Sequence, residues 1–331
     1  MEATRRNENK VKPNSFFSRP LFMQALKANW PLWVALTVGA AGVFFVINIV
    51  INSRDIFSTI DMGKVTNYVT AEGMDWLSIL GLLEQMGFKL SRIQVMSQLD
   101  INGVISDLVY RIAGVLLPMV YVMITCHSLV AAQVGSGSLA YVLSTPTSRK
   151  TVVRTNYLYI LAALLAMYVA ITLAAMGSES IAGLIRMQAR GGTSNMIPLR
   201  TLMYCVASFL SMFALTGICY GASCFFNKPT YSLIVGGGVC ILSFLGCILG
   251  LFGNKVFVAA GLGVESMYVF NYFSIFTLID TDSIGAFAKH AVGQDVDPSY
   301  VWGYEFLAMF LIGVVFAFIG GLRFTKKDLP L

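Results

Sequence analysis

The chain has 331 residues, of which 56% are hydrophobic and only 12% are charged, and its mean hydropathy is +0.72. Because soluble domains carry about 25% charged residues, this composition excludes a soluble protein and predicts an integral membrane protein. The net charge of +6 does not require a nucleic acid as partner, since basic residues that flank membrane spans and attract lipid headgroups account for it.

The first 29 residues are polar and basic, and they predict a cytosolic tail that ends in a short helix. Ser18 followed two residues later by a proline is typical of a helix start. Leu21, Phe22 and Leu26 then give this helix an apolar side. We expect an elbow helix on the inner membrane face or, alternatively, a helical lead-in to the first span.

Residues 30–331 are predicted to form one all-α domain with six membrane spans. A helix needs about 20 apolar residues to cross the hydrocarbon of a bilayer. Six stretches approach or exceed this length: residues 30–51, 112–130, 157–176, 201–226, 232–252 and 302–322. The very short turn between the fourth and fifth spans predicts an antiparallel helical hairpin.

Two polar segments follow the first and third spans. Residues 52–106 contain one amphipathic helical pattern and predict a small extracytosolic cap. This cap is either a connecting loop with a surface helix or a lid over a transport path. Residues 177–199 predict a short amphipathic helix and a turn, without chemistry of their own.

A seventh apolar stretch covers residues 256–278. Gly261, Gly263 and Glu265 divide it into two arms of about ten residues, and each arm is too short to cross a bilayer alone. We therefore expect a re-entrant hairpin before the last span.

The basic residues that flank the spans set the expected orientation. With six spans and both termini on one side, that side holds thirteen Lys and Arg residues against three Asp and Glu residues. We therefore expect both termini in the cytosol and the polar cap outside.

The loop of residues 133–154 between the second and third spans has its own structural pattern. Ser138 is a candidate cap for a helix of about seven residues, which a proline ends. The apolar edge of this helix combines three residues at helical spacing with a neighbouring tyrosine: Leu139, Val142, Leu143 and Tyr141. An exposed apolar edge needs either the membrane surface or another protein to cover it, and both alternatives fit.

Small residues at four-residue spacing predict where membrane helices meet. They form an alanine stripe in the third span and glycine pairs in the fourth and fifth: Ala162, Ala166, Ala170 and Ala174; Gly217 and Gly221; Gly246 and Gly250. All six cysteines lie inside predicted spans without the spacing of a metal site, so we expect them to pack as small apolar residues.

The chain lacks the sequence patterns of an enzyme. It has no GxxxxGK[ST] phosphate loop, so we do not expect it to hydrolyse ATP by itself. Its two histidines, His127 and His290, are too few and too far apart for an HExxH motif or a histidine-rich metal site. We expect no catalytic residue, no metal site and no cofactor in this chain.

Four ionisable residues near the outer ends of the spans are candidates for a substrate gate, because charges within spans are costly and often functional. They are Asp107, Arg111, Glu265 and Glu305. The first two are four residues apart, and an interfacial helix pair is the alternative interpretation. Glu305 lies beside aromatic residues that are typical of the membrane interface. These charges are too few for an ion-coupled carrier.

The loop also resembles a known family. Residues 137–149 hold a glycine, a serine, LAYVLSTP and then SR, and they are similar to the GT-x-x-Y-LLS-x-P-x-SR stretch of permease subunits in type-2 ABC exporters. The run NYFSIF at 271–276 and the tail FTKKDLPL at 324–331 agree with this resemblance, which covers the chain end to end. The chain departs from the family pattern at Gln133 and Asn156, where an acidic residue and a lysine are common.

This resemblance implies a six-span transporter half that pairs with a second permease copy or a relative in the bacterial cytoplasmic membrane. It also implies separate cytosolic ABC ATPase subunits, which carry ATP and Mg²⁺ and grip the loop helix together with the elbow helix. The expected docking residues are Leu139, Tyr141, Leu143 and Pro146, with Arg149 as an inner-surface or ATPase contact.

The expected function is ATP-driven export by alternating access. The apolar, aromatic-rich spans suit an amphiphilic, peptide or drug-like substrate better than a small hydrophilic ion. The alternative is a membrane scaffold or sensor that recruits a cytosolic partner and moves no substrate.

Overall fold

The computed structural model describes residues 16–53, 110, 112, 114–144, 147–190, 198–253, 258, 264–293 and 297–327, and within these residues it contains helices and no strand. Six helical stretches are long and apolar enough to cross a membrane, which confirms the predicted all-α fold with six spans. They are α1 (Arg19–Ser53), α6 (Gly114–Cys126) with its continuation to Gly135, α9 (Arg149–Arg190), α10 (Pro198–Phe225), α11 (Pro229–Leu251) and α14 (Val301–Lys326).

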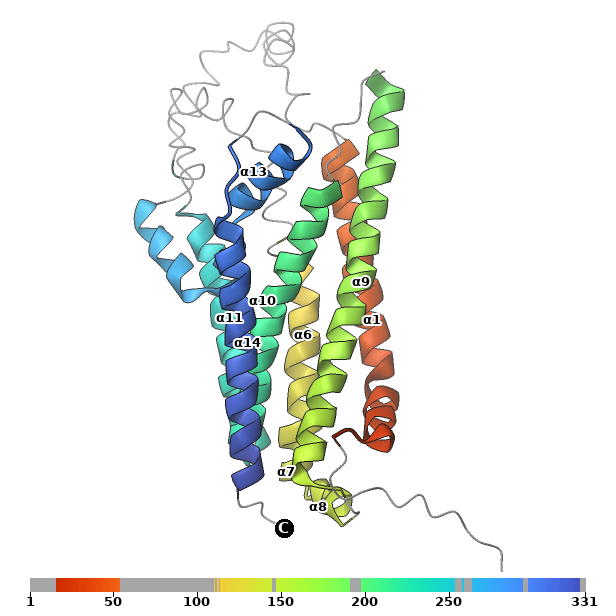
Figure 1. The fold of residues 1–331 in the computed structure, drawn as a ribbon, viewed down its shortest axis with the longest axis vertical. Coiled ribbons are helices and arrows are strands. Elements are labelled where there is room, and N and C mark those ends of the chain that lie inside the picture. The colour runs from red at the N-terminus through yellow and green to blue at the C-terminus, as the bar shows by residue number, and fades with distance from the viewer. Residues whose placement is uncertain are drawn as a thin grey trace, which may run out of the picture.

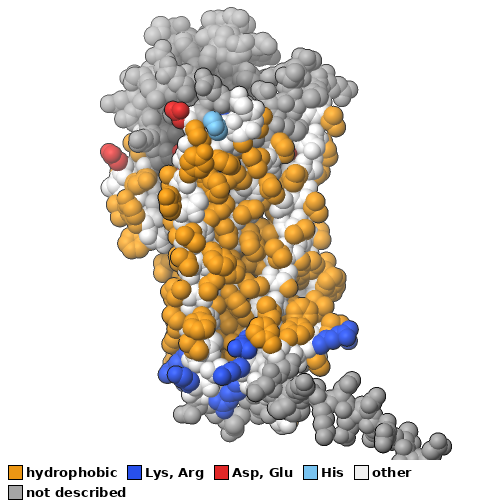
Figure 2. Space-filling model, viewed as in Figure 1, with side chains coloured by type: hydrophobic (Ala, Val, Ile, Leu, Met, Phe, Trp, Pro, Cys, Tyr) orange, Lys and Arg blue, Asp and Glu red, His pale blue; other side chains and the backbone are white. Residues whose placement is uncertain are grey.

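The charged side chains distinguish the two ends of this bundle (Figure 2). The end where α9 begins and α14 finishes carries most of the described Lys and Arg residues, and we call it the basic end. The described Asp and Glu residues lie toward the other end, which we call the opposite end. Both ends of the described chain, at residues 16 and 327, lie at the basic end, as an even number of spans requires.

The spans pack as two groups with α6 between them (Figure 1). One group is the pair α1 and α9, in which the indole nitrogen of Trp33 donates to the carbonyl oxygen of Ala163 at 2.9 Å. The other group is α10 with α11 and α14, in which the rings of Phe213 and Phe310 stack at 5.5 Å. We call the boundary between these two groups the seam.

The glycine pairs lie where helices meet closely, as predicted. A Cβ on Gly217 would collide with the backbone of Gly313 on α14, and a Cβ on Gly250 would collide with the side chain of Asn271. The alanine stripe of α9 differs, because Ala162 and Ala166 are exposed on the outside of the chain. The third span therefore uses other side chains for its contacts within this protein.

Two helices continue beyond their predicted limits. The expected elbow helix and the first span form one helix, α1, which contains Pro31. Residues 177–190 do not form a separate short helix, because α9 runs unbroken for 42 residues, or about 63 Å at 1.5 Å per residue. That is about twice the roughly 30 Å of bilayer hydrocarbon, so α9 extends past the membrane interface.

The second span changes its helical pitch near the basic end. After α6, residues His127–Ala131 form a π-helical segment, η2, and α7 (Ala132–Gly135) completes the span. A π-helical turn leaves a backbone carbonyl without its usual partner and is often found at functional sites.

The expected re-entrant hairpin lies only partly within the described residues. Its second arm forms two 3₁₀ segments, η3 (Glu265–Phe273) and η4 (Ile275–Leu278), and η3 packs along the end of α11. A short helix that was not predicted, α13 (Thr281–Ala291), follows; the side chain of Asp280 caps it by accepting from the backbone of Ser283 at 3.1 Å. The expected cap at residues 52–106 lies almost entirely outside the described residues.

Candidate functional site

The loop helix predicted from the sequence is present at the basic end. It is α8 (Ser138–Leu143), and it lies at the end of the bundle between the end of α7 and the start of α9 (Figure 1). Gly137 precedes it with φ +72°, a left-handed conformation that glycine adopts without steric cost. This turn reverses the chain after α7 and sets α8 across the end of the bundle.

The apolar side chains of α8 point in two directions. Leu139 is only 4% exposed and packs in the buried apolar cluster, and Val142 packs against the same cluster. Tyr141 is 81% exposed. The apolar edge that the sequence predicted to be exposed is therefore turned inward at Leu139, and among the described side chains of α8, Tyr141 is the large one that points outward. The side chain of Leu143 and residue Pro146 lie outside the described part of the structure.

Hydroxyl side chains close both ends of the loop. The hydroxyl of Ser138 donates back to the carbonyl oxygen of Gln133 at 3.3 Å. At the other end, the hydroxyl of Thr147 donates to the carbonyl oxygen of Val142 at 2.9 Å. Ser148 caps α9 by accepting from the backbone nitrogen of Thr151 at 3.2 Å. These bonds satisfy backbone groups that short helices leave unpaired, so α8 is held at both ends.

The loop also touches the turn that joins α10 to α11. A Cβ on Gly135 would lie 2.5 Å from Cγ and 2.7 Å from Cδ of Pro229. Any larger residue would push the end of α7 away from this turn. The end of α7, which leads into α8, therefore lies in direct contact with the α10–α11 turn.

A second chain of contacts joins α9 to α14 and α10. The guanidinium of Arg149 donates to the carbonyl oxygen of Lys327 at 2.9 Å, and the ammonium of Lys327 donates to the last carbonyl oxygens of α10, at Cys224 (3.3 Å) and Phe225 (2.8 Å). A cation at a helix C-terminus is favourable. Burial lowers the pKa of the Lys327 ammonium. The structure thus gives Arg149 a partner within the chain.

The expected elbow residues pack against the same part of α9. Leu21, Phe22 and Leu26 are half-buried against the core, and the ring of Phe22 meets that of Tyr159 edge-on at 5.6 Å. The backbone nitrogen of Ser18 donates to the hydroxyl of Thr155 at 3.1 Å. The beginning of α1 therefore packs on the first turns of α9, which directly follow the loop that contains α8.

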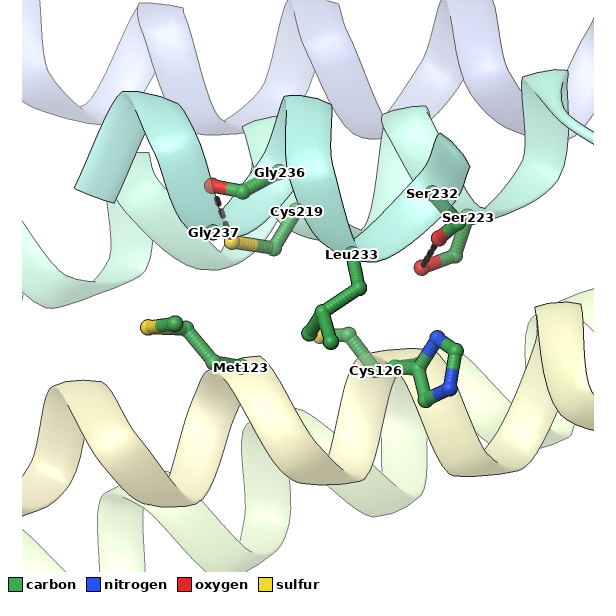
Figure 3. Close-up of a pocket in the computed structure, with 9 residues that line it drawn as sticks. Met123, Cys126, Cys219, Ser223, Ser232, Leu233, Gly236 and Gly237 are labelled. Atoms are coloured by element: carbon green, nitrogen blue, oxygen red, sulfur yellow. Dashed lines mark hydrogen bonds between the residues drawn. The ribbon is translucent and has the colours of Figure 1, made fainter. Parts of the chain in front are cut away.

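The π-helical segment is also tied to α9. The amide nitrogen of Asn156 donates to the carbonyl oxygen of Leu129, in η2, at 3.0 Å. The short amide of Asn156 fits this buried contact. Close by, α6 faces α10 and α11 across residues that include Met123, Cys219 and Ser223 (Figure 3). The space among these side chains is too narrow for a water molecule.

The four gate candidates do not form a site in the described residues. Asp107 and Arg111 lie outside them. Glu265 is exposed at the start of η3, and Glu305 is half-buried in the first turns of α14. The described residues contain no group of three His, Cys, Asp or Glu side chains that could hold a metal ion.

One buried carboxylate was not predicted from the sequence. Glu179 lies on the extension of α9 and is 7% exposed, and it accepts a hydrogen bond from the hydroxyl of Thr201 on α10. The signal was the apolar pattern that continues past Met176 at Ala182 and Ile185, which places Glu179 within a longer helix.

Comparison with known proteins identifies the family. A family model described as ABC-2 family transporter protein matches residues 31–329. Neither a curated protein nor a solved structure matches the chain. The match covers nearly the whole chain, so the protein belongs to the ABC-2 transporter family: it is a multi-pass membrane component of an ABC transporter and is not the ATP-binding subunit.

Proposed function

We propose that this ABC-2 family permease is one half of an exporter that moves an amphiphilic, peptide or drug-like substrate out of the cytosol. ATP and Mg²⁺ bind to separate ATPase subunits, which dock on α8 at the basic end. By the excess of Lys and Arg there, the basic end faces the cytosol of a bacterial cell and both termini are cytosolic. A second copy or a related permease completes the transporter.

The observation that carries this proposal is the position of α8. It presents Tyr141 outward while Leu139 anchors it to the bundle. Exposed aromatic side chains on a rigid element are frequent energetic centres of protein interfaces. Leu139, which we expected to dock, instead supports the helix from below in this proposal.

The contacts of the loop support a transmission role. Gly135 meets the α10–α11 turn, and Arg149 meets the chain end after α14. In this proposal, a force on α8 is transmitted through these two contacts to the α10–α11 turn and to the end of α14. The beginning of α1, which packs on the first turns of α9, is a second contact surface for the ATPase.

The decisive experiment compares two exposed tyrosines. Tyr141→Ala removes the side chain on α8, whereas Tyr272→Ala removes one that is 80% exposed on η3, at the opposite end. We expect Tyr141→Ala to weaken co-purification with the ATPase by about tenfold or more, since interface aromatics commonly contribute this much, and to reduce nucleotide-dependent transport of a fluorescent amphiphile. Tyr272→Ala should keep the ATPase bound.

Equal ATPase binding and transport in both variants would refute docking on α8. One combination of results would favour the scaffold alternative. If the ATPase binds through Tyr141 but an ATPase unable to hydrolyse ATP leaves the substrate distribution unchanged, the chain recruits a partner without moving a substrate.

A further inference from the structure

Glu179 is a buried carboxylate far from the basic end, and the proposed docking of an ATPase on α8 does not explain its position. It is 25 residues beyond Arg154, the last basic residue at the start of α9, which corresponds to about 38 Å along the helix. The carboxylate therefore lies near the interface of the opposite end, yet it is 7% exposed. A buried carboxylate is costly unless a hydrogen bond compensates it, so its partner matters.

The partner lies across the seam. Thr201, in the first turn of α10, is 2% exposed and donates its hydroxyl to Glu179. Glu179 belongs to the α1–α9 pair, and Thr201 belongs to the group formed by α10, α11 and α14. This contact joins the two helix groups at the opposite end.

Aromatic side chains surround the contact. Tyr110, 5% exposed, packs on Phe44 of α1 and on Tyr204 of α10, in each case with ring centroids 4.9 Å apart. The hydroxyl of Tyr204 donates to the carbonyl oxygen of Thr281, at the start of α13, at 3.2 Å. Tyr110 also lies beside Thr201 and Glu179, so elements from both sides of the seam meet at this buried contact.

The seam is also tied at the basic end. The hydroxyl of Tyr220 on α10 donates to the carbonyl oxygen of Val153 on α9 at 2.7 Å. Within the group of α10, α11 and α14, the glycines of α10 meet the backbone of α14 directly. The contacts across the seam given above are made by side chains, so we take the seam as the surface along which the two groups separate.

We propose that Glu179 and Thr201 form a latch that keeps the seam closed at the opposite end, and that this hydrogen bond breaks when the seam opens there. Its role in the transport cycle rests on the proposed function. The latch itself is a property of the chain and is tested without a substrate or an ATPase.

A native cysteine reports on the latch. Cys205 lies one helical turn below Thr201 on α10 and is 3% exposed, so it reacts with a charged, membrane-impermeant thiol reagent only when the opposite end opens. The purified chain in lipid nanodiscs exposes both ends to the reagent, which makes the result independent of orientation. Labelling of the Cys205 peptide is followed by mass spectrometry.

Thr201→Val and Glu179→Ala should each raise the labelling rate of Cys205 about tenfold or more. Each variant removes one hydrogen bond to a charged group, which stabilises the closed seam, and so increases the fraction of molecules that are open. Tyr220→Phe removes a hydroxyl at the basic end and is the matched control, for which we expect no change at Cys205. If Glu179→Ala fails to fold, Thr201→Val and Glu179→Gln decide the test.

Unchanged Cys205 labelling in folded Thr201→Val and Glu179→Ala proteins would overturn the latch. An equal rise in Tyr220→Phe would also overturn it, because the effect would then be general loosening. Loss of ATPase docking in the Tyr141 experiment would leave the latch result untouched, so the two proposals fail separately.

Discussion

The contact between Gly135 and Pro229 gives a direct test of how motion of the loop reaches the spans. In Gly135→Ala the new Cβ would lie 2.5 Å from Cγ of Pro229, whereas ordinary contacts begin near 3.4 Å. The proline ring is rigid, so the end of α7 and the α10–α11 turn must separate by about 1 Å.

Overpacking of this kind costs about 1–3 kcal/mol, and the better helix propensity of alanine offsets at most about 1 kcal/mol. We expect a net loss of up to about 2 kcal/mol in the free energy of unfolding. The larger consequence is a changed position of α8 relative to α10 and α11, which should lower the ATP hydrolysis that substrate stimulates in the assembled transporter more than it lowers ATPase binding.

The matched control is Gly238→Ala in α11, where a new Cβ meets nothing within 4 Å. This variant should be as stable as the parent protein or slightly more stable, because glycine is unfavourable in a helix interior. Thermal unfolding of the purified chain and substrate-stimulated ATPase activity of the complex measure both effects. If Gly135→Ala behaves like Gly238→Ala in both assays, the loop does not act through the α10–α11 turn.

Three further changes test the packing. Gly217→Ala should be strongly destabilising in thermal unfolding, by several kcal/mol, because its Cβ would meet the backbone of Gly313, which has no side chain to move aside; a stable variant would contradict the close contact of α10 and α14. Asn156→Leu should cost about 1–3 kcal/mol of unfolding free energy, because it leaves the buried Leu129 carbonyl unpaired; an unchanged melting temperature would argue against this bond. Lys327→Met should cost about 1 kcal/mol and increase amide hydrogen exchange at the last turn of α10, and unaltered exchange there would refute its capping role.

The spans could be predicted from the sequence because membrane hydrocarbon imposes a simple length and composition on a helix. The glycine pairs of α10 were equally predictable, since close backbone approach requires the absence of a side chain. The same reasoning assigned the alanine stripe of α9 to helix packing without saying which partner it packs on. Small-residue spacing identifies a face of a helix but not the helix that covers this face. In the structure no other helix of the described residues covers Ala162 and Ala166, which are exposed.

The loop helix was predicted in outline and less well in detail. Its start at Ser138 follows from local residue preferences. The inward direction of Leu139 depends on the shape of the bundle below it, which the local pattern does not contain. Lys327 is far from Cys224 in the sequence, so its capping contact becomes visible only when α10 and α14 are placed side by side.

The contacts at the two ends of the seam differ in a way that suits alternating access. At the basic end, the Tyr220 hydroxyl bond is accompanied by Arg149 and Lys327, long side chains that bind backbone carbonyl oxygens and exchange partners at little cost when helices shift. At the opposite end, the buried Glu179 accepts from the short side chain of Thr201, so separation there breaks this bond. A hydrogen bond to a charged group stabilises by about 1.5–3 kcal/mol, which corresponds to roughly 10- to 150-fold in an equilibrium. In the proposed latch, the seam rests closed at the opposite end, and opening it there requires about this free energy.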